Sequence, residues 1–405
     1  MAGLLAGYLF TYLITVNYGA NIFGLLSLCF SIFLFLGILG RIGVDINLVK
    51  QYAEEKNFSD KGLFYRVVLK SFILATVLSV LLIIFKDVLV IALFKKPELQ
   101  PYIFWTALAI PFWTLTLVCA GLLRARKKNK WFAFLNIPGR FTMALIALLI
   151  FFLIEDAPII VIKAHFYGVM FLGLLAFIRC ILLLEGITFR SEVNSWKFLK
   201  GSIPMMLSST ILVVLGWMDT FVLGIYESGD QIGIYNVAIK IAGLASFTFL
   251  AINSILAPKL AEMYSGRNLN SFASLVRFSA LLNGALSIVI VIGILVFHDW
   301  LLKIFGPEFS AGDTVLFILC FGQLITALTG SVGVILQMTG HQVIYQNIMI
   351  IALIVNVILN FVLIPLYGPV GAAIATISSI ICWNVIGAIY IKVKLNISSY
   401  FNPFY

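Results

Sequence analysis

Four cationic side chains lie inside segments that are otherwise apolar. They are Arg41, Arg140, Lys163 and Lys240. A Lys or Arg at the centre of a membrane-spanning helix costs about 2.5–3.5 kcal/mol on insertion scales, so such residues usually face an interior or a water-filled cavity and serve a function. Arginine can hold a phosphate group through paired N–H donors. These cations therefore indicate a site for an anion, and a diphosphate head group fits it.

Depth along the helices separates the four cations. Arg140 follows Lys130 by about ten residues, which is roughly 15 Å of helical rise and therefore close to the bilayer centre. Pro138 and Gly139 can break the helix just before it and release backbone groups, which is tolerated beside a cavity. Lys240 lies roughly 13 Å from its nearest outer loop. We expect both residues to bind substrate, and a structural role is the alternative for each.

The remaining charged residues each have more than one possible role. Arg41 is a third candidate for substrate binding, but Asp45 follows it by one helical turn and could pair with it. Lys163 is close to an outer loop, where its long side chain can reach the interface, and the same applies to His165 beside it. Asp219, in "LGWMDTFVLG", is a candidate counter-ion, a proton or sodium site, or a cap in a broken helix. Asp45 is the second candidate for a counter-ion or coupling role.

The segments that carry these residues are typical of membrane-spanning helices. The chain has 405 residues, of which 62% are hydrophobic and 11% are charged, whereas a soluble domain has about 25% charged residues. Apolar runs of about 20 residues follow one another along nearly the whole chain. We therefore expect an all-α integral membrane protein with about twelve spanning helices. The expected spans lie near residues 2–16, 22–47, 67–94, 101–123, 131–154, 158–184, 202–226, 232–257, 275–297, 310–339, 343–366 and 370–391.

The distribution of basic residues predicts the orientation of these helices. Most of the 27 Lys and Arg residues fall in alternate connections, while the other connections include acidic stretches such as "IEDAP" and "YESGDQ". Because basic loops usually stay in the cytoplasm, both termini are expected to be cytoplasmic. The net charge of +10 then follows from topology, with some attraction to anionic membrane lipids, and needs no nucleic-acid partner.

The chain also shows signs of an internal duplication. The stretch "FKDVLVIALFKKPE" from Phe85 is similar to "FHDWLLKIFGPE" from Phe297. Further identical residues recur at the same spacing of about 210, which preserves helix orientation and predicts parallel repeats with a substrate site between them. These further pairs are Gly24 with Gly233, Lys50 with Lys259, Arg66 with Arg277, and Asn136 with Asn347.

The duplication divides the chain into two predicted lobes of six helices each. Residues 1–184 form the first lobe, and residues 202–405 form the second lobe with a short cytoplasmic tail. The polar stretch at 185–201, "EGITFRSEVNSWKFLKG", is the expected cytoplasmic linker.

Several enzyme classes find no support in the sequence. It contains no GxxxxGK[ST] phosphate loop, no HExxH and no GxSxG, and no long extracytoplasmic loop that could hold a glycosyltransferase site. The five cysteines show no metal-ligand spacing. We therefore expect neither an enzyme nor a metal or other cofactor, and transport would be driven by an ion gradient or by the gradient of the cargo.

Three stretches carry a resemblance to a known family. The segment "WMDTFVLGIYESGDQIGIYNVAIKIAGLASFTFLAINSILAPKLAEMYSG", followed by "GPEFSAGDTVLFIL" and "NVILNFVLIPLYGPVGAAIATISS", resembles the polysaccharide and O-antigen repeat-unit flippases of the multidrug/oligosaccharidyl-lipid/polysaccharide exporter superfamily. The resemblance covers essentially the whole chain and is strongest after Ser202. Asp219, Lys240 and Pro258 match its pattern.

The resemblance implies a fold and an activity. The expected fold is a V-shaped pair of six-helix bundles. It would move undecaprenyl-diphosphate-linked oligosaccharide from the cytoplasmic to the outer leaflet of the bacterial inner membrane by alternating access. Arg41, Arg140 and Lys240 would line its cationic central cavity. Polysaccharide polymerase machinery is a candidate partner, and a proton or a sodium ion is a candidate coupling ion.

Three alternatives stay open. Two belong to the same superfamily, namely an ion-coupled multidrug exporter and a flippase for the lipid precursor of peptidoglycan. The third is of another class, a membrane glycosyltransferase or ligase. The chain also starts within its first helix, without the basic lead that such flippases usually have, so that helix is expected to be shortened.

Overall fold

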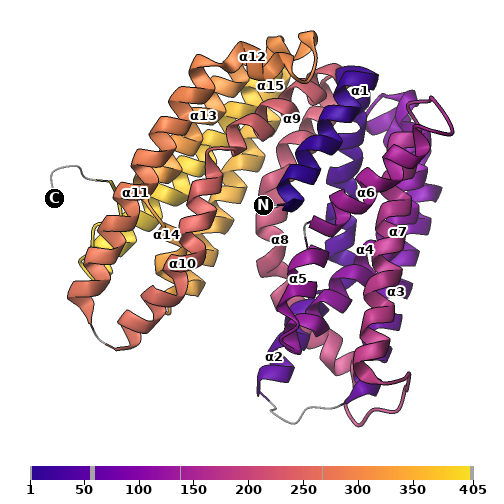
Figure 1. Ribbon diagram of the computed structural model, residues 1–405, viewed down its shortest axis with the longest axis horizontal. Coiled ribbons are helices and arrows are strands. Elements are labelled where there is room, and N and C mark those ends of the chain that lie inside the picture. The colour runs from indigo at the N-terminus through magenta and orange to yellow at the C-terminus, as the bar shows by residue number, and fades with distance from the viewer. Residues whose placement is uncertain (1, 55–59, 137, 267, 402–405) are drawn as a thin grey trace. The chain divides into compact units, whose positions relative to one another are not determined.

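The computed structural model describes residues 2–54, 60–136, 138–266 and 268–401, and this part of the chain is almost entirely helical (Figure 1). It contains no strand within these ranges. The chain divides into two compact units, Met1–Val214 and Leu215–Tyr405. The predicted division into lobes at the 185–201 linker stays a prediction.

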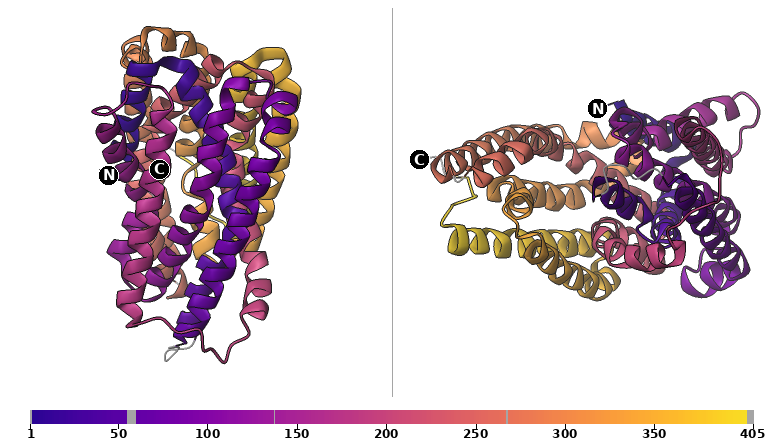
Figure 2. Two further views of the ribbon diagram at one scale, coloured as in Figure 1. Left: turned by 90° about the vertical axis from the view of Figure 1, so that its right-hand side faces the viewer. Right: turned by 90° about the horizontal axis from the view of Figure 1, so that it is seen from below.

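In the first unit, α4 is the central helix. Its apolar stretch is 89% buried, and it packs against α1, α2, α3, α5 and α7. Figures 1 and 2 show α4 in the interior of this unit, where it lies alongside α3 and α7. The elements of this unit are α1 (Ala2–Arg41), α2 (Val44–Glu54), α3 (Lys61–Ile84), the π-helix η1 (Val88–Leu93), the 3-10 helix η2 (Pro97–Leu99), α4 (Gln100–Ala125), α5 (Asn129–Asn136), α6 (Pro138–Phe151), α7 (Ile160–Leu184) and most of α8 (Ser195–Tyr226).

In the second unit, α13 packs against α9, α11 and α15. An apolar cluster joins α10, α11, α14 and α15 around Phe272, Leu260 and Ile335. The elements are the end of α8, α9 (Gly229–Gly243), α10 (Ser246–Ser265), α11 (Leu269–Val296), α12 (His298–Lys303), the 3-10 helix η3 (Pro307–Gly312), α13 (Asp313–Thr329), α14 (Val332–Met338) and α15 (Gln342–Leu395).

Polar side chains fix the starts of several helices. Asp60, Ser228 and Asn268 precede α3, α9 and α11, and each accepts a hydrogen bond from the backbone N–H three residues later, at 2.9, 3.4 and 3.2 Å. These bonds satisfy donors that have no partner within the helix.

Breaks in the helices correct several expected spans. The span expected at 22–47 ends at Arg41, because Ile42 and Gly43 have positive φ values of 50° and 72°. The span expected at 310–339 is interrupted at Gly330, where φ is 76°. A side chain at Gly330 would meet the carbonyl oxygen of Ser399 in the C-terminal segment, so glycine permits both the turn and the close approach.

The apolar helices support a multi-pass membrane protein. Within the described residues, seven helices are long and apolar enough to cross a membrane, and the number rises to ten if three bent helix pairs each count as one span. α1 and α15 are each interrupted by a non-helical residue, Gly19 or Gly368. The 54 residues of α15 would extend about 81 Å as one straight helix, far more than the roughly 30 Å of a bilayer core. The total of twelve crossings requires both elements to cross twice and stays a prediction.

Two backbone features recur at corresponding places in the two units. Glu185 caps the C-terminal end of α7 and Asn396 caps that of α15, and both caps are left-handed, with φ of 54° and 55°. Lys95 and Gly306 also have positive φ, and each lies just before one of the short 3-10 helices η2 and η3. These features recur at the spacing of about 210 residues that the sequence predicts for parallel repeats.

Candidate functional site

Arg140 is positioned by the break that its neighbours predict. α5 ends at Asn136 and α6 begins at Pro138, and the two helices are bent by 56°. Proline suits the first position of a helix because its missing N–H would have no helical partner there. A Cβ atom on Gly139 would lie 2.8 Å from a methyl group of Leu172 and 2.9 Å from the carbonyl oxygen of Phe134. Glycine therefore lets the start of α6 pack closely at this point.

The guanidinium of Arg140 is buried in an aromatic cage. Only 5% of the residue is exposed, and its Nε donates a hydrogen bond to Nε2 of His165 on α7 at 3.0 Å. Aromatic faces attract a cation within about 6 Å, and more strongly when the cation is desolvated. The guanidinium carbon lies 4.5, 4.9, 5.0 and 5.8 Å from the ring centroids of Phe30, Phe33, Phe141 and Trp113.

Two polar atoms in this cage have no hydrogen-bond partner among the described residues. They are Nη2 of Arg140 and Nδ1 of His165. Because His165 accepts at Nε2, its neutral ring carries the proton on Nδ1, so both unpartnered atoms are donors. Within the described ranges Arg140 forms no ion pair with a carboxylate. Buried donors are usually paired, so the cage has unused capacity for an acceptor.

The position of His165 differs from our expectation. We expected it to share the interfacial setting of Lys163, whose Nζ does reach Glu155 at 2.9 Å. His165 is instead fully buried, and its ring centroid lies 4.6 Å from that of Phe30. Residues two apart on a helix point to nearly opposite sides, so the neighbours in sequence face different environments.

Arg41 and Asp45 form the ion pair that was one of their two interpretations. Nη1 of Arg41 lies 2.8 Å from Oδ2 of Asp45, and the two side chains are 11% and 16% exposed. The pair bridges the turn between α1 and α2. A Cβ atom on Gly43 in this turn would lie 2.7 Å from the backbone nitrogen of Met206, so glycine is needed where α8 approaches.

Lys240 lies in the last turn of α9. It is half-buried, and α9 and α10 are bent by 48° just after it. The C-terminal end of a helix carries a partial negative charge that favours a cation. Lys240 is therefore placed at a broken helix, as Arg140 is, but in the second unit.

Asp219 is the centre of a buried polar cluster in the second unit. It is 4% exposed and lies on α8, and its partners come from α9 and from both halves of α15. Its carboxylate accepts hydrogen bonds from the hydroxyl of Tyr235 at 2.8 Å, from Nδ2 of Asn360 at 2.6 Å, from Nδ2 of Asn356 at 3.2 Å, and from the hydroxyl of Thr376.

This cluster offers several oxygen atoms to a small cation. The carboxylate has neutral donors as partners, and Oδ1 of Asn360 has no hydrogen-bond partner in the described part of the chain. Turning the amides of Asn356 and Asn360 would present further carbonyl oxygens. Hard cations prefer carboxylate and amide oxygens as ligands.

Of the residues in this cluster, the sequence alone identifies only Asp219 as a candidate site residue. Asp219 stands out in the sequence as a charge in an apolar segment, whereas Asn356 and Asn360 are two of several uncharged polar residues in such segments. Their spacing of four residues, which places both on one helix face, was the available signal. Nothing in the sequence distinguished Tyr235 or Thr376 from other hydroxyl residues in apolar segments.

The five predicted site residues thus fall in two groups. Arg41, Asp45 and Arg140 belong to the first unit, and Asp219 and Lys240 belong to the second. Their roles in substrate binding and ion coupling stay predictions.

Comparison with known families decides the affiliation of the chain. Residues 1–264, well over half of the chain, match the family described as "Polysaccharide biosynthesis protein". The chain belongs to this family. Residues 204–362 also match the MatE family.

Proteins with related sequences include two from Haloferax volcanii. The chain is 29% identical over 177 residues to the "Probable low-salt glycan biosynthesis flippase Agl15", which is 44% of this chain and 38% of that protein. It is 26% identical over 173 residues to the "Probable flippase AglR", which is 42% of this chain and 36% of that protein. The chain thus matches less than half the length of these relatives.

Solved structures of transporters share the fold. The inward closed conformation of the lipid II flippase MurJ superposes with a TM-score of 0.80 at 16% identity, over 96% of this chain and 86% of MurJ. An inward-facing multidrug resistance MATE transporter of the MOP superfamily superposes with a TM-score of 0.80 at 15% identity, over 98% and 95% of the two chains. These similarities confirm the predicted class, an all-α membrane protein with the fold of this exporter superfamily.

Proposed function

We propose that the protein is a flippase for undecaprenyl-diphosphate-linked oligosaccharide, such as a polysaccharide or O-antigen repeat unit. It would move this lipid from the cytoplasmic to the outer leaflet of the bacterial inner membrane by alternating access. Membership of the polysaccharide biosynthesis family and the names of the Haloferax relatives support the activity. Both termini would be cytoplasmic, and polysaccharide polymerase machinery would be a partner.

The strongest structural support comes from Arg140. Among the described residues its buried guanidinium keeps an N–H donor without a partner, and it is held by uncharged groups, four aromatic rings and a neutral imidazole. A diphosphate that reached it would not have to displace a carboxylate. Charge-assisted hydrogen bonds from arginine to phosphate are about twice as strong as neutral ones. A cationic drug, in contrast, would be repelled here.

Arg41 and Lys240 complete the proposed set of substrate cations. Arg41 is already paired with Asp45, so a phosphate would compete with that carboxylate. This arrangement suits a transient contact with the substrate, because the ion pair between Arg41 and Asp45 can form again when the substrate leaves. Lys240 would contribute a point charge from the second unit.

Asp219 is the proposed coupling site for a proton or a sodium ion. Binding of either would neutralise the carboxylate and rearrange its hydrogen bonds to α9 and α15. Since these helices belong to the same unit, ion binding would change how they pack. This is the type of differential contact that shifts a transporter between two states.

Flipping in reconstituted vesicles tests the role of Arg140. We expect Arg140→Ala to lower the rate of flipping of a fluorescent undecaprenyl-diphosphate sugar by at least about tenfold, which corresponds to the loss of one charge-assisted contact of ~1.4 kcal/mol. Arg140→Lys should retain part of the rate, because it keeps the charge but loses the paired donors.

Lys303→Ala is the matched control. Lys303 is an exposed cation on α12, paired with Asp299, and its removal should leave the flipping rate unchanged. Normal flipping by both Arg140 variants would contradict the proposed contact with phosphate.

The match of residues 204–362 to the MatE family favours one alternative, an ion-coupled multidrug exporter. The same vesicles discriminate between this exporter and the proposed flippase. An exporter would accumulate cationic dyes under an imposed ion gradient and would leave the lipid-linked sugar in its original leaflet. A parallel assay with a lipid-linked peptidoglycan precursor in the same vesicles tests the remaining alternative, a flippase for that precursor. We propose no enzymatic activity.

A further inference from the structure

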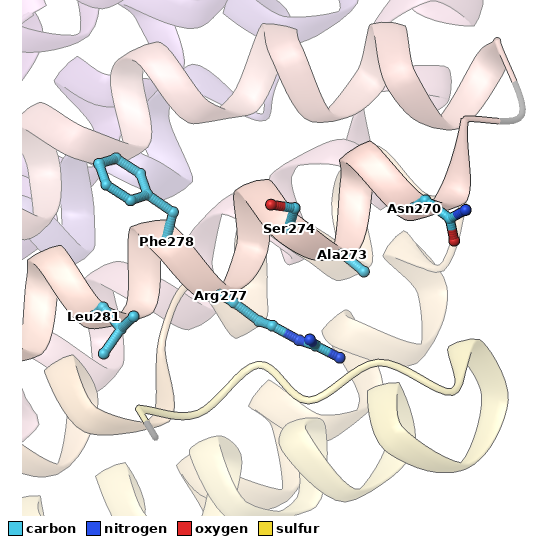
Figure 3. Close-up of a pocket in the computed structure, with 6 residues that line it drawn as sticks. All are labelled: Asn270, Ala273, Ser274, Arg277, Phe278 and Leu281. Carbon is cyan, nitrogen blue, oxygen red and sulfur yellow. The ribbon is translucent and has the colours of Figure 1, made fainter. Parts of the chain in front are cut away.

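Two cavities outside the proposed transport site lie at equivalent places in the two repeats. The first, which we call the linker pocket, has a volume of about 550 Å³ and is lined by Arg66 and Lys70 of α3 and by residues 191–196. The second, the α11 pocket, has a volume of about 380 Å³. It is lined by Asn270, Ala273, Ser274, Arg277, Phe278 and Leu281 (Figure 3).

The repeat relates the cations of the two pockets. Arg66 and Arg277 are separated by the spacing of about 210 residues that relates the two halves. The chain segments next to them are also equivalent, since the linker follows the left-handed cap at Glu185 and the C-terminal segment follows the same cap at Asn396. In Figure 3, Arg277 and Asn270 project from the same side of α11.

In the linker pocket both cations are held in place by uncharged groups. Arg66 donates from Nε to the carbonyl oxygen of Phe189 at 2.6 Å. Lys70 donates to the hydroxyl of Ser195 at 2.7 Å, and its Nζ lies 3.8 Å from the ring centroid of Trp196. Neither cation forms an ion pair among the described residues. The remaining guanidinium and ammonium donors are therefore positioned for an anion.

The residues around this pocket are typical of a membrane interface. Trp196 is 64% exposed, and Ile187 and Phe189 of the linker are 56% and 51% exposed. Exposed tryptophan beside Lys and Arg is characteristic of the head-group region of a bilayer. Among the described residues that line the pocket, Glu192 is the one carboxylate, and its side chain is exposed to solvent.

We propose that the linker pocket binds the phosphate of an anionic phospholipid head group, and that the α11 pocket is its counterpart in the second repeat. The pocket volume is sufficient for a glycerophosphate head group. Basic pockets on the cytoplasmic side of membrane proteins bind such head groups, and the basic linker is expected on that side. A bound lipid would hold the linker to α3 through Arg66 and Lys70.

Quenching of Trp196 fluorescence tests the proposal directly. The protein is reconstituted with phosphatidylglycerol or phosphatidylcholine brominated near the head group, and the signal of Trp196 is obtained by subtracting that of Trp196→Phe. We expect brominated phosphatidylglycerol to quench Trp196 at a mole fraction about 25-fold lower than brominated phosphatidylcholine, with about fivefold from each of the two basic residues. Arg66→Gln and Lys70→Gln should each lower this preference about fivefold, the factor expected for one basic residue at an anionic surface.

Two further variants serve as controls, one conservative and one far from the pocket. Lys70→Arg should retain the preference, and Lys303→Gln, on the opposite predicted face, should not change it. Equal quenching by the two lipids, or a preference that survives loss of both cations, would overturn the proposal. So would abolition of the preference by millimolar inorganic phosphate, because the site would then bind free phosphate. The readout is lipid contact, so its failure is separate from failure of the flippase proposal.

Discussion

At the scale of single residues, Asp219 carries a clear prediction. Asp219→Asn keeps the shape of the side chain but removes the charge, so we expect it to abolish the acceleration of flipping by an imposed sodium or proton gradient. Flipping without a gradient should continue. The measurement is the flipping rate in vesicles with and without the gradient, compared with the same ratio for the wild type.

Asp230→Asn provides the control for this variant. Asp230 lies in the first turn of α9 in the same unit, and it is exposed. Its substitution should leave the acceleration intact. If the gradient still accelerates Asp219→Asn to the wild-type extent, Asp219 is not the coupling site.

The sequence predicts which charged residues lie within the apolar segments, but it does not predict which side chains surround them. The depth of Arg140 follows from helical rise alone, and the structure places it in the buried interior. Its cage could not be predicted, because Phe30, Phe33 and Trp113 come from α1 and α4 and many of the 35 Phe residues occur in equivalent apolar patterns. The burial of His165 was missed for the same reason, since it depends on which side of α7 faces α6.

At the scale of helices, close packing of α6 and α7 depends on Gly168. A Cβ atom there would lie 2.5 Å from the backbone nitrogen of Ala144 and 2.7 Å from its Cα. Because backbone atoms cannot rotate away, Gly168→Ala must push the helices apart. Overpacking of this kind costs about 1–3 kcal/mol, so the midpoint of thermal unfolding in detergent should fall.

Gly293→Ala is the matched control. Gly293 lies within α11, and nothing occupies the space around its Cβ position. Alanine there should leave the midpoint unchanged or raise it slightly, since alanine favours a helix by roughly 0.5–1 kcal/mol relative to glycine. Equal midpoints for Gly168→Ala and the wild type would show that α6 and α7 can move apart without loss of stability.

Composition predicted the helices, but it did not predict where each one breaks. Apolar runs identify a spanning segment without indicating its internal turns. The interruption at Gly330 depends on the approach of Ser399, which is a tertiary contact. The break before Arg140 was predictable because Pro138 restricts the backbone locally.

At the scale of the whole molecule, the topology can be tested with introduced cysteines. Four native cysteines are buried and Cys382 is partly buried, so background labelling should be low. We expect Lys303→Cys to react with a membrane-impermeant maleimide added outside intact cells. Lys128→Cys should react only after permeabilisation, because its connection is predicted to be cytoplasmic. The reverse labelling pattern would show that the protein has the opposite orientation in the membrane.

The Asp219 cluster also has a consequence for biosynthesis. Its partners on α15 follow it in the chain by 137, 141 and 157 residues, which a ribosome takes roughly 7–30 s to add at ordinary elongation rates. During that interval the newly made segment around Asp219 must enter the bilayer with Tyr235 as its earliest partner. A nascent chain stalled before α15 would therefore hold a buried carboxylate that lacks three of its four donors.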